Sequence, residues 1–378
     1  MFAAPGSCLT PLRFGHIVAR VKRIRVGRRG ARMRAGAAVF ATLLTVTLSV
    51  SSAFAQSVKI TPLGSHAGEL CFNDRALLFE DPTGVRILYD AGRTVAGGTD
   101  PRLGEVHVVL LTHAHGDHIG DTKAAGPDAG ACDQPATVSA APNSNTAEIA
   151  ASKNSAVIVS NDMGAFLARK IQNIRGAETP ACPATGLGRE VTVPRSSPCV
   201  GNVQLGGKRT VRDFGHDRGV QIALVQADHS NNVPRTLLAD GARTNLAPDN
   251  LTAYVGHANG YVLTFTNGLK AYLSGDTAVM GDMKTIINGF YRVNLAVVNM
   301  GAFAMQSEET AFAVNELIQP AAVIPSHVNE AATTSGKVNP HTKTRQFMDL
   351  VKGPLVHVPL SGKTMQFDGS GKCTAGCF

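Results

Sequence analysis

The chain has 378 residues, 44% of them hydrophobic, and a formal net charge of +8. This length accommodates one large domain or two small ones. Nine of the 36 basic residues lie in the first 34 positions, which hold no acid, so the rest of the chain has 27 basic against 28 acidic residues. A nearly neutral body excludes the extended basic surface typical of nucleic-acid-binding proteins.

The N-terminal segment has the order of a secretory signal peptide. A basic region at 1–34 precedes an apolar run at 35–50, and a small-x-small cleavage site ends at Ala55. The apolar run is too short and too rich in Ala and Thr to be a stable membrane span. We therefore expect residues 1–55 to be the leader of a periplasmic or secreted protein, with Met33 as an alternative start. A mitochondrial-type transit peptide is the other interpretation.

Six cysteines remain once such a leader is removed, namely Cys71, Cys132, Cys182, Cys199, Cys373 and Cys377. An even number in an exported chain favours disulfide bonds, although sequence alone allows fifteen pairings. The spacing favours Cys182 with Cys199 and Cys373 with Cys377. Free buried thiols are the alternative for some of the six.

The body begins with short apolar segments. Strands are expected at 57–62, 77–81 and 85–90, with a turn around Thr83. A continuous apolar run at 108–111 predicts a further strand that is buried on both faces.

Metal-ligand side chains follow this strand at once, in the sequence THAHGDHIGD. Three imidazoles and a carboxylate within six positions cannot be buried together without a neutralising partner. His113 and His115 are two positions apart and project to the same side, so they can bind one cation. Asp117 and His118 are placed to reach a second cation. An incidental histidine-rich loop is the alternative, and it explains the position after a buried strand less well.

The pattern T-H-x-H-x-D-H resembles the signature of the metallo-β-lactamase superfamily. This version is most similar to the branch that contains L-ascorbate-6-phosphate lactonase and many uncharacterised metal-dependent hydrolases. The resemblance implies an α/β (α+β) fold, the four-layer αβ/βα sandwich in which two sheets stack with helices outside. It covers 57–122 and 215–367, and we therefore expect one hydrolase domain at 56–378 with an insertion at about 124–215.

The resemblance suggests roles for two residues early in the chain, Asp90 and His66. Asp90 ends a predicted strand where the superfamily has a carboxylate beside the site, so it either supports a ligand histidine or is a routine turn residue. Gly64-Ser65-His66 is similar to the Gly-His-Ser of the family with the last two exchanged, which suggests a role for His66 near the substrate.

The rest of the chain alternates between strands and helices. Loops are expected at 124–155, with room for one short helix, and at 176–201 and 231–250, and the insertion is expected to shape the substrate pocket. Strands are expected at 156–160, from Val220, and at 261–266, 270–274, 295–298, 321–326, 355–359 and 364–367. Helices are expected at 164–174, about 280–289, 307–318 and 341–352.

Three later polar residues, His229, Asp276 and His327, each follow an apolar strand. The resemblance assigns His113, His115 and His229 to a first metal, Asp117, His118 and His327 to a second, and Asp276 to a bridge between them. The other histidines are interpreted as structural or surface residues, namely His107, His216, His257, His341 and His357.

These ligands predict an exported dinuclear hydrolase that acts on a small molecule. A metal-bridged hydroxide is expected to attack a lactone or ester carbonyl, with Asp117 as the catalytic residue that orients the nucleophile and carries its proton. Zinc is the default for a histidine-rich site, and the carboxylates also admit Mn²⁺ or Fe²⁺.

Other functions remain open at this stage. A phosphodiesterase of the same fold and a non-catalytic metal-binding protein are the alternatives. A true β-lactamase is disfavoured, because those members of the superfamily lack the bridging aspartate found here as Asp276. The related tRNA-processing nucleases share the motif, but a neutral, exported body argues against them. The sequence leaves the oligomeric state undefined.

Overall fold

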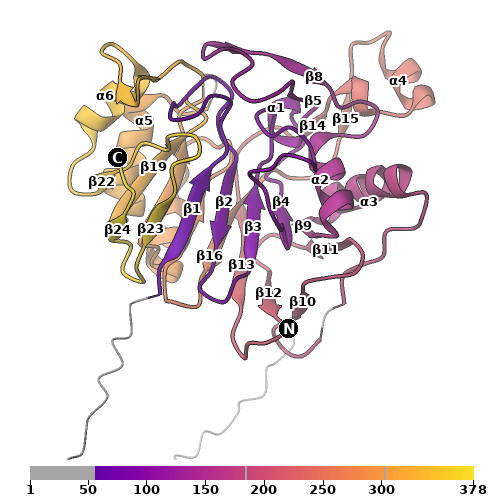
Figure 1. Cartoon of the computed structure of the whole chain (residues 1–378), viewed down its shortest axis with the longest axis horizontal. Coiled ribbons are helices and arrows are strands. Elements are labelled where there is room, and N and C mark those ends of the chain that lie inside the picture. Colours follow the sequence, from indigo (N-terminus) through magenta and orange to yellow (C-terminus); the bar gives the residue numbers. More distant parts are fainter. Residues whose placement is uncertain (1–55, 184, 302–303) are drawn as a thin grey trace, which may run out of the picture. The chain divides into compact units, whose positions relative to one another are not determined.

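The computed structural model of the protein describes residues 56–378 except 184, 302 and 303 (Figure 1). The predicted leader at 1–55 lies outside the described residues. Two eight-stranded sheets form the body of the described chain.

The first sheet has the strand order β11-β9-β4-β3-β2-β1-β23-β24. Its strands are β1 (Val58–Pro62), β2 (Leu77–Glu80), β3 (Arg86–Tyr89), β4 (Val108–Leu110), β9 (Ala156–Ser160), β11 (Cys199–Val203), β23 (Met365–Phe367) and β24 (Cys373–Ala375). The second sheet has the order β10-β12-β13-β16-β17-β18-β19-β22. Its strands are β10 (Val191–Val193), β12 (Lys208–Asp213), β13 (Val220–Gln226), β16 (Asn259–Thr264), β17 (Lys270–Leu273), β18 (Leu295–Asn299), β19 (Ala322–Ser326) and β22 (Leu355–Val356).

Helices and short strand pairs complete the described chain. The helices are α1 (Gly116–Ile119), α2 (Asn145–Lys153), α3 (Asn161–Arg175), η1 (Arg235–Leu237), α4 (Asp240–Leu246), η2 (Met283–Tyr291), α5 (Ser307–Phe312), η3 (Ala313–Ile318) and α6 (Lys343–Leu350). The strand pairs are β5 (Thr122–Ala124) with β8 (Thr137–Ser139), β6 (Gly130–Ala131) with β7 (Gln134–Pro135), β14 (Asn232–Val233) with β15 (Ala253–Tyr254), and β20 (Thr333–Thr334) with β21 (Lys337–Val338).

Alternation along the strands explains how four layers form. In β4, Val108 packs between the two sheets, whereas Val109 faces the helices outside the first sheet. In β17, Leu273 faces the first sheet and Tyr272 packs on the other side. Because successive strand residues point to opposite faces, a strand covered on both sides reads as a continuous apolar run. The layered fold predicted from the sequence is thereby confirmed.

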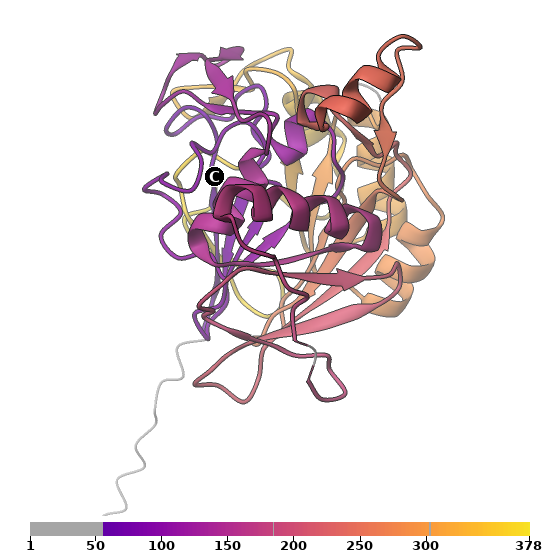
Figure 2. The ribbon, with the colours of Figure 1, turned by 90° about the vertical axis from the view of Figure 1, so that its right-hand side faces the viewer.

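The outer layers belong to different parts of the chain. Helices α2 and α3 cover the first sheet, and η2, α5, η3 and α6 cover the second. Figure 1 shows α2 and α3 on one side of the described body and α5 and α6 on the other. The turned view in Figure 2 shows α4, in salmon, projecting beyond the sheets.

The structure corrects the expectations for three predicted loops. The stretch 124–155 contains the strands β6, β7 and β8, and its one expected short helix is present as α2. The stretch 176–201 contains β10 and the start of β11, and the strand β12 follows it. The stretch 231–250 contains η1 and α4, and none of the α4 residues is buried. These segments were missed because they are short, and because α4 has no apolar face from which to read a helical period.

The region at 124–215 supplies β9 and β11 to the first sheet and β10 and β12 to the second. Much of it is therefore core structure. Its status as an insertion relative to other proteins stays a prediction.

The six described cysteines pair as Cys71–Cys132, Cys182–Cys199 and Cys373–Cys377. The second and third pairs are those predicted from the spacing. The first joins residues 61 positions apart and so required the tertiary structure. Among the described residues, no helix has the length and apolar character needed to cross a membrane.

Strand direction decides where functional residues meet. Strands β13 and β17 both run antiparallel to β16, and β17, β18 and β19 are parallel, so β13, β17 and β19 end at one edge of the second sheet. The end of β4 in the first sheet joins this edge, because the Tyr261 hydroxyl donates to the carbonyl of Leu111 at 2.8 Å and Asn259 N donates to the carbonyl of Thr112 at 3.0 Å.

Candidate metal centre

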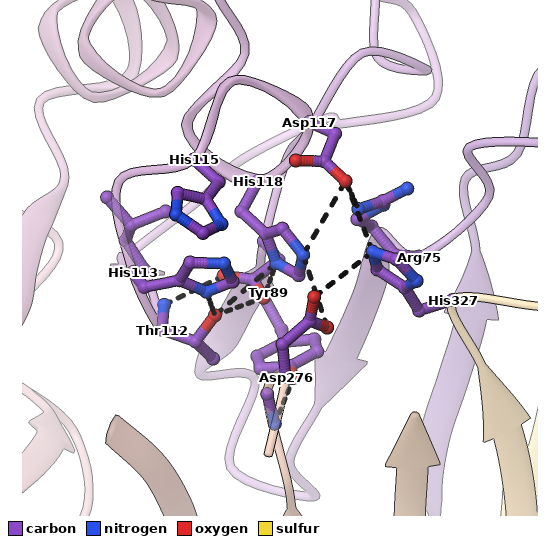
Figure 3. Close-up of polar contacts among 12 residues, drawn as sticks. Arg75, Tyr89, Thr112, His113, His115, Asp117, His118, Asp276 and His327 are labelled. Atoms are coloured by element: carbon purple, nitrogen blue, oxygen red, sulfur yellow. Dashed lines mark hydrogen bonds and ion pairs between the residues drawn. The ribbon is translucent and has the colours of Figure 1, made fainter. Parts of the chain in front are cut away.

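All seven predicted ligands lie together where these four strands end (Figure 3, in which all of them except His229 are labelled). They form three overlapping groups, and within each the candidate ligand atoms lie within 4.8 Å of one another. The first group is His113, His115 and His229, and the second is Asp117, His118 and His327. The remaining group, His113, His118 and Asp276, links these two. The structure thus brings together every residue of the predicted site.

The motif after β4 can turn sharply because of its glycines. Gly120 ends the short helix α1 at φ 74°, and a side chain there would place Cβ 2.5 Å from the carbonyl oxygen of Gly92. Gly275, before Asp276, has φ 60°, and its Cβ would lie 2.9 Å from that of Thr112. Glycine is thus required at both positions for the two loops to approach.

The first group consists of imidazoles. Nδ1 of His115 faces Nε2 of His229 at 3.2 Å, and the His113 ring stands nearly perpendicular to the His229 ring with centroids 4.9 Å apart. His113 is fully buried, whereas His229 keeps some exposure. The group therefore closes the bottom of the site and leaves its rim accessible.

The second group adds a carboxylate. Oδ2 of Asp117 lies 3.1 Å from Nε2 of His327 and 3.9 Å from Nε2 of His118. The His327 ring packs against the backbone at position 301. This is possible because residue 301 is glycine: a Cβ there would lie 2.7 Å from Nδ1 of His327.

Asp276 stands between the two groups. Its Oδ2 is 3.3 Å from Nε2 of His327 and 3.8 Å from Nε2 of His229, and its Oδ1 is 3.4 Å from Nε2 of His118. One carboxylate therefore faces ligands of both predicted cations, as a bridging ligand must.

Asp90 supports two of the histidines from behind. Its Oδ2 accepts a hydrogen bond from Nδ1–H of His118 at 2.8 Å and another from the Thr112 hydroxyl at 2.7 Å. The Thr112 oxygen is in turn 3.0 Å from Nδ1 of His113 and accepts its proton. With both Nδ1 atoms protonated, His113 and His118 each present an unprotonated Nε2 as a ligand. The sequence allowed two interpretations of Asp90. The structure supports the one in which Asp90 is a hydrogen-bond partner of a candidate ligand histidine.

Unpaired polar atoms show that a cation fits this centre. Within the described part of the chain, Nε2 of His113, Nε2 of His118 and Oδ1 of Asp276 are buried and have no hydrogen-bond partner. Buried polar atoms are normally paired, since leaving them unpaired costs free energy. Nitrogen and carboxylate oxygen are suitable donors for zinc and similar divalent ions.

The electrostatics of the centre also favour cation binding. Burial alone would raise the pKa of Asp276, but the imidazoles of His118 and His327 hold it well below its ordinary value. Burial lowers the pKa of His113 far below its ordinary value and lowers that of His115 to about 4. The carboxylates are therefore ionised and these imidazoles neutral, as metal ligands must be.

His118 differs from the other histidines. Burial lowers its pKa, but the carboxylates of Asp276, Asp90 and Asp117 outweigh that effect and raise it to about 10. A positive charge is therefore favoured at this place in the protein, and a proton on His118 supplies it when no metal ion does.

Three functional neighbours were not found from the sequence: Arg75, Thr112 and Tyr89. Arg75 forms an ion pair with Asp117, and the Tyr89 hydroxyl accepts a hydrogen bond from Gly275 N at 3.1 Å. Thr112 adjoins the motif, but nothing in the pattern distinguishes a supporting hydroxyl from an ordinary threonine. Arg75 lies two residues before the apolar strand β2. This position was the sequence feature that could have indicated a role for Arg75 beside the site.

The remaining histidines lie outside the three ligand groups. His107 accepts a hydrogen bond from Arg86 N, and His216 bonds to Asp213 at the surface. His66 contacts the Ser65 hydroxyl at 3.0 Å and the carbonyl of Gly130 at 3.2 Å. A role for His66 near the substrate stays a prediction.

Asp74, next to Arg75, provides a test through the pH dependence of stability. It is buried and accepts hydrogen bonds from Ser65 N and Cys71 N, both at 2.8 Å. Burial raises its pKa from 3.8 to about 6. Since the folded-state pKa exceeds the unfolded value, the stability that Asp74 contributes is fully present below the unfolded pKa and is lost as the pH rises through the folded pKa.

We expect Asp74→Asn to destabilise the protein most near pH 4, because one of the two backbone N–H groups loses its acceptor. The penalty should shrink by about 2–3 kcal/mol between pH 4 and pH 8, since only the wild type then bears a buried charge. Urea unfolding of both proteins across this pH range measures the difference. A penalty that stays constant or grows with pH would contradict the assignment.

Comparison with known proteins found sequence relatives and solved structures similar to this chain. No family model matches the chain. A UPF0173 metal-dependent hydrolase of Cupriavidus necator is 27% identical over 282 residues, which cover 73% of this chain and 78% of that protein. A UPF0173 metal-dependent hydrolase of Koribacter versatilis is 28% identical over 287 residues, covering 75% and 89%. Igni18, a metallo hydrolase of Ignicoccus hospitalis, covers 82% of this chain and 99% of its own at 19% identity, with a TM-score of 0.49.

The two-sheet sandwich, the His-x-His-x-Asp-His motif and three later ligand-type residues at one sheet edge are the arrangement that the resemblance to the metallo-β-lactamase superfamily implies. The sequence relatives are named metal-dependent hydrolases, and they support a hydrolase of this fold. The fold and the hydrolase class predicted from the sequence are thereby confirmed.

Proposed function

We propose that the protein is an exported dinuclear hydrolase that cleaves a lactone or ester bond in a small molecule. The observation that carries this proposal is the position of Asp276, whose two oxygens lie 3.3–3.8 Å from ligand nitrogens of both groups. A single-metal site does not require a carboxylate in that position.

In this proposal the two cations have separate ligand sets that share Asp276. His113, His115 and His229 hold the first, and Asp117, His118 and His327 hold the second. The predominance of imidazole favours Zn²⁺, while three carboxylates in and behind the site, counting Asp90, also admit Mn²⁺ or Fe²⁺.

Two bound divalent ions would make hydroxide available at neutral pH and polarise the bond to be cleaved. The protein's own residues prepare that chemistry. Asp90 and Thr112 fix the tautomers of His118 and His113. Burial opposes ionisation of Asp117, but Arg75, His118 and His327 hold its pKa well below the ordinary range. Asp117 therefore remains an ionised hydrogen-bond acceptor, suited to orienting the attacking water as predicted.

Export is supported by the three disulfide bonds, since such bonds are rare in reducing compartments. Expression of the full chain in a Gram-negative host tests this part of the proposal. The periplasmic fraction should contain a shortened chain starting near residue 56. A full-length chain retained in the cytosol would contradict it.

Metal removal tests the proposed function directly. The purified protein should contain about two divalent ions per chain by elemental analysis. Prolonged EDTA treatment should abolish hydrolysis of the best substrate from a panel of lactones, esters, phosphodiesters and β-lactams. Added Zn²⁺ or Mn²⁺ should restore it.

The panel also separates the alternatives. Preferential cleavage of a phosphodiester would replace the lactone or ester assignment. Two bound metals without hydrolysis of any substrate would favour a metal-binding protein, and hydrolysis unaffected by EDTA would overturn the metal mechanism.

A further inference from the structure

Arg75 brings a positive charge into the proposed metal centre. It lies just before β2, and only 1% of its side chain is exposed. Figure 3 shows its guanidinium beside Asp117 and His327. Nη1 forms an ion pair with Oδ2 of Asp117, and Nε donates to the carbonyl of Asn73 at 3.2 Å. The guanidinium is therefore held in one place and has little contact with water.

The oxygen that Arg75 contacts is the same one that faces the second group of ligands. Oδ2 of Asp117 lies 3.1 Å from Nε2 of His327 and 3.9 Å from Nε2 of His118. A cation bound at this position would share that oxygen with the guanidinium. Two positive charges would then contact one carboxylate oxygen.

The first group has no such neighbour. Among the hydrogen bonds and ion pairs of the described residues, no lysine or arginine contacts His113, His115 or His229. Their partners are Thr112, Ser230, Asp276 and one another. The two proposed cation positions thus differ in local charge. Because the Arg75 side chain and His327 beside it are buried, solvent and salt screen the charge of Arg75 only weakly at the second position.

We propose that Arg75 is a positioning residue that holds Asp117 in place and lowers the affinity of the second position for a divalent ion, so that the first position fills first. This inference rests on the proposed dinuclear function. Arg75 replaces part of the charge that the second ion would otherwise supply. The second ion therefore gains less from binding than the first.

Two substitutions separate charge from position. Arg75→Gln removes the charge and keeps an N–H donor for Asp117, whereas Arg75→Lys keeps the charge and loses the planar fork. Arg86→Gln is the matched control, because Arg86 pairs with Glu80 at the opposite end of β3 from the metal centre. Circular dichroism verifies that each variant is folded.

Calorimetric titration of the EDTA-treated proteins with Zn²⁺ alone gives the dissociation constant of each position. In the wild type we expect two events whose constants differ at least 10-fold. Arg75→Gln should tighten the weaker event at least 10-fold and leave the tighter one unchanged. Arg75→Lys and Arg86→Gln should retain the wild-type difference.

Several results would overturn the inference. A second event that is unchanged or weaker in a folded Arg75→Gln variant would show that the charge does not oppose binding. Loss of the difference in Arg75→Lys would do the same, and this test remains if the Gln variant does not fold. When the wild type binds two ions and hydrolyses substrate, such results overturn only the role of Arg75. A wild type that binds no Zn²⁺ would instead overturn the proposed function itself.

Discussion

Replacing Asp276 with Asn is expected to lower kcat/KM at least about 1000-fold, equivalent to about 4 kcal/mol of transition-state stabilisation. Asp276 is a carboxylate that faces both ligand groups, with oxygens 3.4 Å from His118 and 3.8 Å from His229. An amide keeps the shape of the side chain, but it loses the charge and one acceptor oxygen. Steady-state kinetics with the best substrate measure the loss, and elemental analysis should show fewer than two metal ions per chain.

Asp282→Asn is the matched control for this substitution. Asp282 lies six residues further along the chain, is exposed, and belongs to none of the ligand groups. Its replacement should leave metal content and kinetics at the wild-type level. Full activity and full metal content in Asp276→Asn would remove the bridging role from the proposal.

Asp90→Asn is expected to weaken metal binding about 10- to 100-fold, although Asp90 belongs to none of the ligand groups. Its Oδ2 accepts hydrogen bonds from His118 Nδ1–H and from the Thr112 hydroxyl. An Asn amide placed there would donate toward His118 and favour the tautomer that carries its proton on Nε2. That tautomer cannot bind a cation through Nε2. Titration of the EDTA-treated variant with Zn²⁺ measures the affinity.

Substitutions at Thr112 are expected to change metal affinity less than Asp90→Asn does, through the same hydrogen bonds. Thr112→Ser keeps the hydroxyl between Asp90 and His113, so metal affinity should remain at the wild-type level. Thr112→Val removes that link while leaving the contact of Asp90 with His118, and an intermediate loss is expected. If Asp90→Asn binds metal as tightly as the wild type, the hydrogen-bonded pair does not control the tautomer.

The site could be predicted well from the sequence because its chemistry is concentrated in short segments. His113, His115, Asp117 and His118 follow one strand within six positions, and few other patterns explain such a group. The three later ligands were recognisable because each follows an apolar strand and because their order resembles a known family. Their metal-binding roles remain predictions, whereas their convergence at one sheet edge is observed.

The supporting residues could not be predicted in the same way. Arg75 and Asp117 are 42 positions apart in the chain, and no periodicity relates them. Asp90 had two equal interpretations until its contact with His118 was seen at 2.8 Å. The strands β10, β11 and β12 were missed because none of them contains a long uninterrupted apolar run, and because pairing with other strands stabilises them more than local propensity does.

By itself, the sequence of this protein indicated the class of fold, the candidate ligands at the strand ends and two of the three disulfide pairs among the described residues. Those features depend on local order, such as an apolar run followed by histidines, or two cysteines close together. The tertiary structure alone decided which carboxylate faces both ligand groups, which residues orient the histidines, and that a buried arginine stands beside Asp117. These depend on strand direction and packing between distant segments, which bring side chains within hydrogen-bond distance although the chain separates them by many residues.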